Sequence, residues 1–201
     1  EAKLLTCPVR GSLSVSSLAK DGLTTSEEAR RIDFINFLLS RKYPKENIAV
    51  ETIVIKQLGE SGRNKVRCDV IAYSVPVSEI KQLEVQERLK KAVLIAEIKR
   101  DSKGKRSGIK NQLEPALRQT PGIKVMGAYW DDKSKLLFTK KLVKKDDDQY
   151  IDIEKDNLEN LPVFGNKYRA KALTIQDLTK PDDLMGLLFD VANVMRSHGI
   201  N

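Results

Sequence analysis

Two carboxylates and one amine lie near the ends of neighbouring apolar stretches of the sequence. Asp69 lies within KVRCDVIAY, and Glu97 and Lys99 end the stretch AVLIAEIK. In a strand, residues two positions apart point to the same side, so we expect Glu97 and Lys99 to face the same way. If the two strands are neighbours, Asp69 can lie beside Glu97. The spacing therefore predicts a pair of carboxylates with a lysine next to it.

This combination of residues suits metal-assisted hydrolysis of a phosphodiester. Carboxylate oxygens are the ligands that Mg²⁺ prefers, with Mn²⁺ as a substitute. A lysine beside the metal can polarise or deprotonate a water, or hold a phosphate oxygen. Because the chain has 28 acidic and 36 basic residues, the same pattern also arises by chance as an ion pair at a strand end. The cost of an unpaired carboxylate in an apolar strand favours the functional interpretation.

The chain is basic, with a formal net charge of +8, and this favours an anionic partner, nucleic acid first. Aromatic residues make up only 5%, so a base-stacking surface is not expected. The two cysteines, Cys7 and Cys68, have neither CxxC spacing nor a histidine cluster, which argues against a zinc site. A basic stretch follows the buried strand, and its candidate phosphate contacts are Arg100, Lys103, Lys105, Arg106 and Lys110.

Hydrophobic periodicity predicts the elements that position these residues. Thr25 is expected to cap a helix, with Glu28 closing a capping box. A surface helix is expected within 77–92, and a further helix at 109–119, although Pro115 argues against an unbroken one. The predicted strands are 47–58, 65–75, 92–99, 124–131 and 136–143. This order predicts an α/β domain with a mixed central sheet flanked by helices.

Three segments are expected along the chain. Residues 1–23 form an N-terminal arm with one short strand, residues 24–143 form the core, and residues 144–201 form a connector. The connector is irregular to about residue 180 and ends in an amphipathic helix. No apolar stretch reaches the roughly 20 residues that span a bilayer, so no membrane partner is expected. A reduced, cytoplasmic setting fits best.

Four blocks of the sequence resemble a known nuclease domain. SEEARRIDFINFLLSRKYPKENIAVE, RCDVIAY, VLIAEIKRDS and IKNQLEPALRQTPGIKVMGAYWDD are similar, in order, to the N-terminal nuclease domain of type I restriction enzyme R subunits. That domain belongs to the PD-(D/E)XK superfamily, which implies a restriction-endonuclease-like fold and Mg²⁺-dependent DNA cleavage. The resemblance covers residues 24–140 of the chain.

The resemblance also implies a role for individual residues. Asp69 and Glu97 would bind metal, and Lys99 would be the catalytic lysine. Glu27 would be the acid of the first helix, and Gln112 the glutamine that follows the catalytic strand. Without the resemblance, Glu27 is equally a first-turn acid favoured by the helix dipole, and Gln112 a polar helix residue.

The sequence departs from the family pattern at three places. Cys68 precedes Asp69 where proline is usual, and Ala116 takes the place of a tyrosine four residues after Gln112. The segment 77–92 is longer than expected between the two motif strands.

The C-terminal part resembles a connector to a helicase or methyltransferase core. The expected partners are therefore DNA and helicase, translocase or methyltransferase domains or subunits. Two alternatives remain. One is a catalytically silent DNA-binding module of a larger restriction or repair protein. The other is a structural or interaction domain whose positive charge is not used to bind DNA.

Overall fold

The computed structural model describes residues 4–56, 65–145 and 148–169. The chain divides into two units, 1–169 and 170–201, and the second lies outside the described residues. The predicted C-terminal amphipathic helix and its link to further domains fall there. The division into arm, core and connector stays a prediction.

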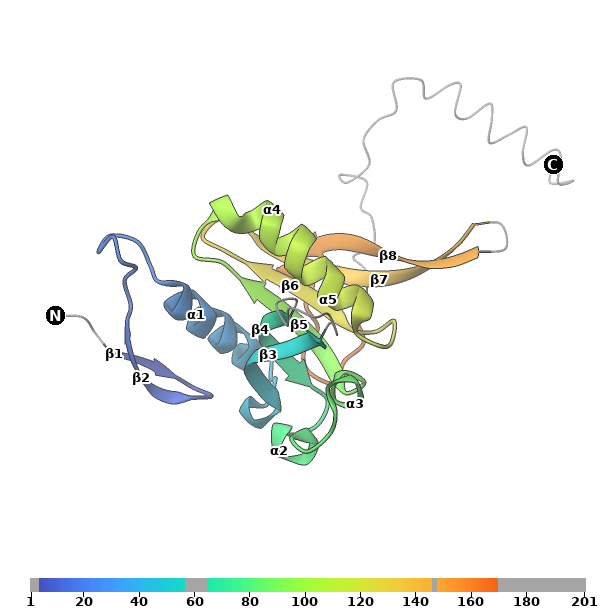
Figure 1. Cartoon of the computed structure of the whole chain (residues 1–201), viewed down its shortest axis with the longest axis horizontal. Coiled ribbons are helices and arrows are strands. Elements are labelled where there is room, and N and C mark those ends of the chain that lie inside the picture. The colour runs from blue at the N-terminus through green and yellow to red at the C-terminus, as the bar shows by residue number, and fades with distance from the viewer. Residues whose placement is uncertain (1–3, 57–64, 146–147, 170–201) are drawn as a thin grey trace, which may run out of the picture. The chain divides into compact units, whose positions relative to one another are not determined.

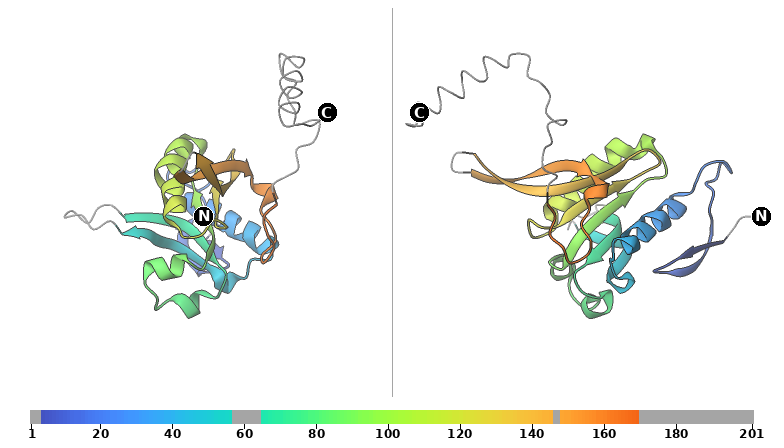
Figure 2. Two further views of the ribbon diagram at one scale, coloured as in Figure 1. Left: turned by 90° about the vertical axis from the view of Figure 1, so that its right-hand side faces the viewer. Right: turned by 180° about the vertical axis from the view of Figure 1, so that it is seen from behind.

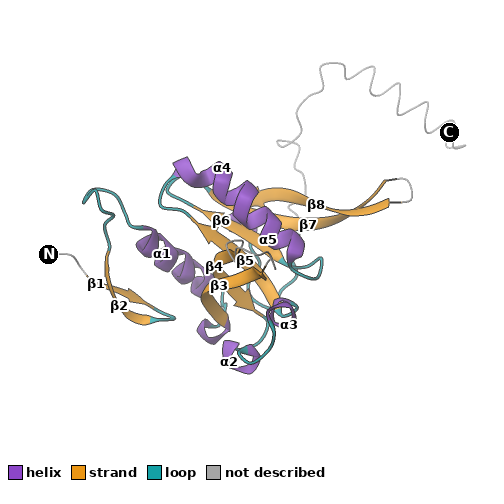
Figure 3. Ribbon diagram, in the orientation of Figure 1, coloured by secondary structure: helices purple, strands orange, loops and turns teal. Residues whose placement is uncertain are grey.

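The described part of the chain is built on a mixed six-stranded sheet, drawn in Figures 1 and 3. Neighbours in the sheet are also neighbours in sequence, and only β5 and β6 run parallel to each other. The predicted mixed α/β architecture is therefore confirmed. The strands are β3 (Ile48–Lys56), β4 (Lys65–Tyr73), β5 (Ala92–Ile98), β6 (Met126–Trp130), β7 (Lys135–Lys145) and β8 (Asp148–Asn157).

Helices cover both faces of the sheet. Helix α1 (Glu27–Ser40) packs an apolar stripe that includes Phe34 and Leu38 against one face. The parallel connection from β5 to β6 is helical from 102 to 119 and packs Leu113 and Leu117 against the other face. Figure 2 shows the sheet between them. The connection consists of η2 (Ser102–Gly104), α4 (Lys105–Ser107), η3 (Gly108–Leu113) and α5 (Glu114–Gln119). Strand β5 is thus buried on both faces, as predicted.

Pro115 does not interrupt this helical connection. The preceding segment η3 is a π-helix, and Pro115 follows it in the first turn of α5. A wider turn changes the hydrogen-bond pairing before α5 begins. The connection can therefore continue through a residue that normally breaks a helix interior.

The predicted capping box is wrong by one residue. Ser26 caps α1, and its Oγ accepts a hydrogen bond from the N–H of Ala29 at 3.1 Å. Thr25 is held in an antiparallel bridge with Leu18 of the arm, so the helix begins one residue later than expected. Glu28 consequently does not close a box and forms ion pairs instead.

Two further segments, the arm and residues 77–92, differ from the sequence prediction. The arm contains a hairpin, β1 (Leu4–Cys7) and β2 (Gly11–Ser16), rather than one strand. The segment 77–92 contains two short helices, α2 (Val77–Ile80) and α3 (Val85–Leu89), rather than one. Each of them buries a single large apolar residue, Ile80 or Leu89.

The prediction of irregular chain from residue 144 to about 180 is wrong for 148–157, because β8 pairs with β7 along its whole length. Strand β8 lies at the edge of the sheet and is rich in charge, as edge strands often are. Among the helices described here, none combines the length and the apolar character needed to cross a membrane.

Candidate active site

Strands β4 and β5 are antiparallel neighbours, as the sequence predicted, and bring Asp69 to the end of β5. Val70 pairs with Ala96, so the same register continued by one residue places Asp69 opposite Glu97. The Asp69 Oδ2 accepts a hydrogen bond from the N–H of Ile98 at 2.7 Å. The Asp69 carboxylate is therefore fixed across the end of the neighbouring strand.

Glu97 and Lys99 point to the same side of β5, and Lys99 Nζ donates to Glu97 Oε1. Ile98 points to the opposite side and packs with the core on the α1 face. Glu97 is only 3% exposed. The expected alternation is confirmed, and it leaves a nearly buried carboxylate with a lysine as its partner.

Glycine allows the helical connection to lie close over this pair. A Cβ at Gly108 would be 3.0 Å from Tyr129 Cε2 and 3.3 Å from Lys99 Cε. A Cβ at Gly104 would be 3.2 Å from the Lys99 stem. The stem of Lys99 is therefore enclosed by backbone, which restricts where its amine can go.

The electrostatics of the pair follow from burial and from neighbouring carboxylates. Burial, followed by the charge of Asp69, raises the pKa of Glu97 to about 7, although the hydrogen bond from Lys99 acts in the opposite direction. Burial by itself lowers the pKa of Lys99, but the hydrogen bond and charge of Glu97 outweigh it, so the net shift is upward. Lys99 is therefore a cation at neutral pH, and the carboxylates are held close enough to repel each other.

Glu27, the first residue of α1, lies at the same site. Its side chain is 44% exposed, and its charge acts on both Glu97 and Lys99. Glu27 and Lys99 line an open pocket of about 470 Å³ between the arm and the start of the helical connection. The other residues of this pocket are Ala19, Lys20, Ser26, Arg100, Asp101 and Gly104.

Arg31, which the sequence pattern did not indicate as a site residue, links the acids of the site. Arg31 is 5% exposed, and its Nη2 donates to Asp69 Oδ1 at 2.8 Å. It also forms ion pairs with Glu28, with Glu51 at 3.4 Å and with Glu27 at 3.7 Å. One signal was available, because Arg31 has the helical spacing of the buried residues of α1 and interrupts their apolar stripe.

In the described part of the chain, no side-chain hydrogen bond joins Gln112 to Glu97 or Lys99. It lies in η3, and its Oε1 is buried without a hydrogen-bond partner among the described residues. Its predicted role therefore stays a prediction.

Most of the predicted DNA contacts gather at one place. Lys103, Lys105, Arg106 and Lys110 line an open pocket of about 370 Å³ on the helical connection, whereas Arg100 belongs to the pocket of Glu27 and Lys99. Lys105 Nζ donates to Ser134 Oγ at 2.8 Å, and Lys110 pairs with Glu114 at 2.7 Å. Lys103 and Arg106 are exposed to solvent and free to meet a phosphate.

The donor set of the site fits a hard divalent cation. In residues 4–56, 65–145 and 148–169, no group of three or more acidic, histidine or cysteine side chains is arranged to hold a metal. Asp69 and Glu97 are two, and Mg²⁺ often uses one or two carboxylates and keeps several waters. Within the described ranges, the ion pairs of the site join five carboxylates to three cations, Arg10, Arg31 and Lys99.

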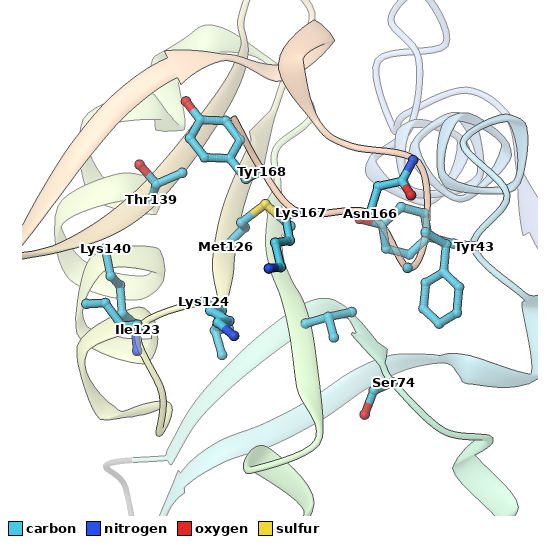
Figure 4. A pocket seen from close by; sticks show the side chains of 14 residues that line it. Tyr43, Ser74, Ile123, Lys124, Met126, Thr139, Lys140, Asn166, Lys167 and Tyr168 are labelled. Carbon is cyan, nitrogen blue, oxygen red and sulfur yellow. The ribbon is translucent and has the colours of Figure 1, made fainter. Parts of the chain in front are cut away.

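A further pocket, of about 570 Å³, includes none of the predicted site residues. Figure 4 shows Lys140 and Ile123 on one side of it and Tyr43 and Asn166 on the other. Lys140 is 7% exposed and donates to the carbonyl oxygens of Thr120 and Gly122.

Comparison of the chain with protein-family models, with curated proteins and with solved structures found no match.

Proposed function

We propose that the chain contains a metal-dependent endonuclease domain of the PD-(D/E)XK type that hydrolyses DNA phosphodiester bonds. The observation that carries the proposal is the meeting of Asp69, in the middle of β4, with Glu97 and Lys99 at the end of β5. Glu97 is an acid inside an otherwise apolar, buried strand, with its pKa raised to about 7. Strongly shifted titratable groups beside an open pocket are typical of functional sites.

The proposed role of each residue follows from its contacts. Asp69 and Glu97 would hold Mg²⁺ or Mn²⁺. A divalent cation held there supplies Lewis-acid polarisation of a phosphate oxygen and of a water. Lys99, as a cation, donates a hydrogen bond to a phosphate oxygen or orients the attacking water, and its pairing with Glu97 limits its position. Glu27 adds an exposed acid on the wall of the pocket.

The DNA would lie along the basic start of the helical connection. Arg100 is at the pocket of Lys99, and the exposed side chains of Lys103 and Arg106 follow it along the chain. Such contacts go to phosphates and carry no sequence information, so intrinsic cleavage should show little sequence preference. We further propose that the domain acts in a cytoplasmic restriction-modification system, in which helicase, translocase or methyltransferase partners select the target.

The first experiment is cleavage of supercoiled plasmid with Mg²⁺ or Mn²⁺. We expect nicked or linear product that disappears with EDTA and in Lys99→Ala. Lys141→Ala is a matched control, because Lys141 is also a strand lysine paired with a glutamate, Glu154, but the pair is exposed. Cleavage by Lys99→Ala at the wild-type rate would contradict the proposed catalytic role of Lys99.

One observation favours a second candidate, a catalytically silent DNA-binding module. Each carboxylate of the pair already has a cationic partner, Arg31 for Asp69 and Lys99 for Glu97. A silent module binds DNA in a salt-dependent manner and never cuts it. For a nuclease, Glu97→Ala should leave DNA affinity intact and abolish cleavage. A protein that shows no salt-dependent DNA binding would fit neither candidate, and would favour an interaction domain.

A further inference from the structure

Strand β4 changes faces at Asp69, which lies opposite Glu51 of β3. Val50 pairs with Val70 and Thr52 pairs with Cys68, while the pair between them is outside the regular ladder. Val70 packs in the core on the α1 face, but Cys68, two residues earlier, packs in the core on the opposite face. A regular strand would place both on the same side. The Asp69 backbone therefore lies at a local twist in the sheet.

The twist coincides with a left-handed backbone at Glu51, where φ is 54°. A residue with a side chain pays about 1 kcal/mol or more for this conformation. Lys42, the other described non-glycine residue with positive φ, follows the end of α1, where such a residue closes the helix. Glu51 has no helix to close. Strain of this kind is maintained mainly where a side chain must be aimed.

The Glu51 side chain is aimed at Arg31, at 3.4 Å between Oε1 and Nη1. Arg31 lies between Glu51 and Asp69, and its two terminal nitrogens contact different acids. Both oxygens of Asp69 are in use, Oδ1 with Arg31 and Oδ2 with the N–H of Ile98. A cation that binds Asp69 would therefore share this carboxylate with a buried guanidinium, and the two positive charges would repel each other.

We propose that Arg31 is a resident counter-ion of Asp69 that a divalent cation displaces, and that Glu51 then holds the displaced guanidinium. This inference rests on the proposed function, because it concerns metal binding at the same site. The exchange needs only a small movement, since Arg31 already contacts Glu51 and Glu28. Arg31 and Glu51 are positioning residues here. They set the affinity of the site for metal and leave the affinity for DNA unchanged.

The test is calorimetric titration of the full chain with Mn²⁺ alone, without DNA. We expect Glu51→Gln to weaken Mn²⁺ binding about tenfold, because Arg31 then has a weaker alternative to Asp69. We expect Arg31→Gln to strengthen it about tenfold, because one competing charge is gone. The side chain of Glu51 is 49% exposed, so Glu51→Gln should fold normally. Lys42→Gly is the matched control, since it changes the other left-handed residue and should leave Mn²⁺ affinity unchanged.

A double-mutant cycle separates the exchange from a general effect of charge. Loss of a nearby negative charge weakens cation binding whether or not Arg31 is present. If Glu51 acts through Arg31, Glu51→Gln should change the affinity less than threefold in an Arg31→Gln background. Arg31→Lys serves in the same cycle if Arg31→Gln does not fold, because one amine cannot contact Asp69 and Glu51 in the way that a guanidinium does.

The outcomes distinguish this inference from the proposed function. Wild-type Mn²⁺ binding that is unaffected by Glu51→Gln, or an equal loss in both backgrounds, overturns the counter-ion exchange and leaves the nuclease proposal intact. No Mn²⁺ binding by the wild-type chain overturns both. A tenfold loss that depends on Arg31 supports the exchange.

Discussion

Two lysines, the half-buried Lys99 just after β5 and the buried Lys140 of β7, show how differently the same side chain can be held. The amine of Lys99 meets a carboxylate, and the pKa of this lysine is raised. The amine of Lys140 donates to the backbone carbonyls of Thr120 and Gly122, and burial lowers its pKa to about 8. The pKa values of the two lysines are thus shifted in opposite directions.

The difference shows that a shifted pKa does not by itself identify a catalytic lysine. A lysine with a pKa near 8 has the value expected of a general base. Yet the amine of Lys140 holds the loop between α5 and β6, and its described hydrogen bonds go only to backbone oxygens. Lys99 lies where acids, cations and an open pocket meet. We therefore assign chemistry to Lys99 and a structural role to Lys140.

The largest expected effect is on cleavage. Lys99→Ala should lower the rate of plasmid nicking by about 100-fold or more, as is usual when a charge-stabilising donor is removed. Lys140→Ala should remain within about twofold of wild type at a temperature where both proteins are folded. Loss of nicking in a folded Lys140→Ala protein would reverse the assignment of the two lysines.

The next effect concerns stability and pH. The pKa of Lys140 is about 8 in the folded protein and 10.5 in an unfolded chain, so the unfolded chain holds more protons between these values. The free energy of unfolding should therefore rise with pH between 8 and 10.5, and the cost of burial is fully present below pH 8. Across this pH range, the free energy of unfolding of the wild-type protein should rise by about 3 kcal/mol relative to that of Lys140→Met, at about 1.36 kcal/mol for each unit of pKa difference.

Urea unfolding of wild type and Lys140→Met at several pH values measures this gain. Other ionisable groups are common to both proteins and cancel in the difference. A difference in unfolding free energy that stays constant between pH 7.5 and 10 would show that Lys140 has an ordinary pKa.

Much of the candidate site could be predicted from sequence because its signals are local. The alternation that aligns Glu97 with Lys99 belongs to one strand, and successive strands often pair, which brings Asp69 to them. Arg31 and Glu51 could not be found in this way. Their contacts join residues 20 and 38 positions apart, and they depend on a left-handed backbone at a residue that is not glycine.

The errors in the fold have a similar origin. Ser26 caps α1 because Thr25 is paired with Leu18, which is a tertiary contact that a capping motif does not contain. Strand β8 lies at a sheet edge, where charged residues obscure the apolar pattern. In both cases a contact with another part of the chain decided the outcome.

A smaller effect should arise from the glycine above Lys99. Gly108→Ala places a methyl group 3.0 Å from the buried ring of Tyr129, and we expect about 2 kcal/mol of destabilisation by urea unfolding. Gly104→Ala is the matched variant, because its methyl group would meet only the flexible stem of Lys99 at 3.2 Å. It should cost less than Gly108→Ala. Equal costs would mean that Tyr129 adjusts as easily as the lysine stem.

The smallest expected effect tests whether DNA lies at the Lys99 end of the molecule. Lys20 lines the pocket of Glu27 and Lys99, whereas Lys124 lines the pocket beside Lys140, and both residues are exposed. Each phosphate contact that is lost should reduce the salt slope of DNA binding by about 1. With Ca²⁺ in place of Mg²⁺ and a labelled duplex, Lys20→Ala should weaken binding a few-fold and Lys124→Ala should not. Because both variants remove one exposed positive charge, a general effect of net charge would weaken both equally, and only contact with DNA at the Lys99 end separates them.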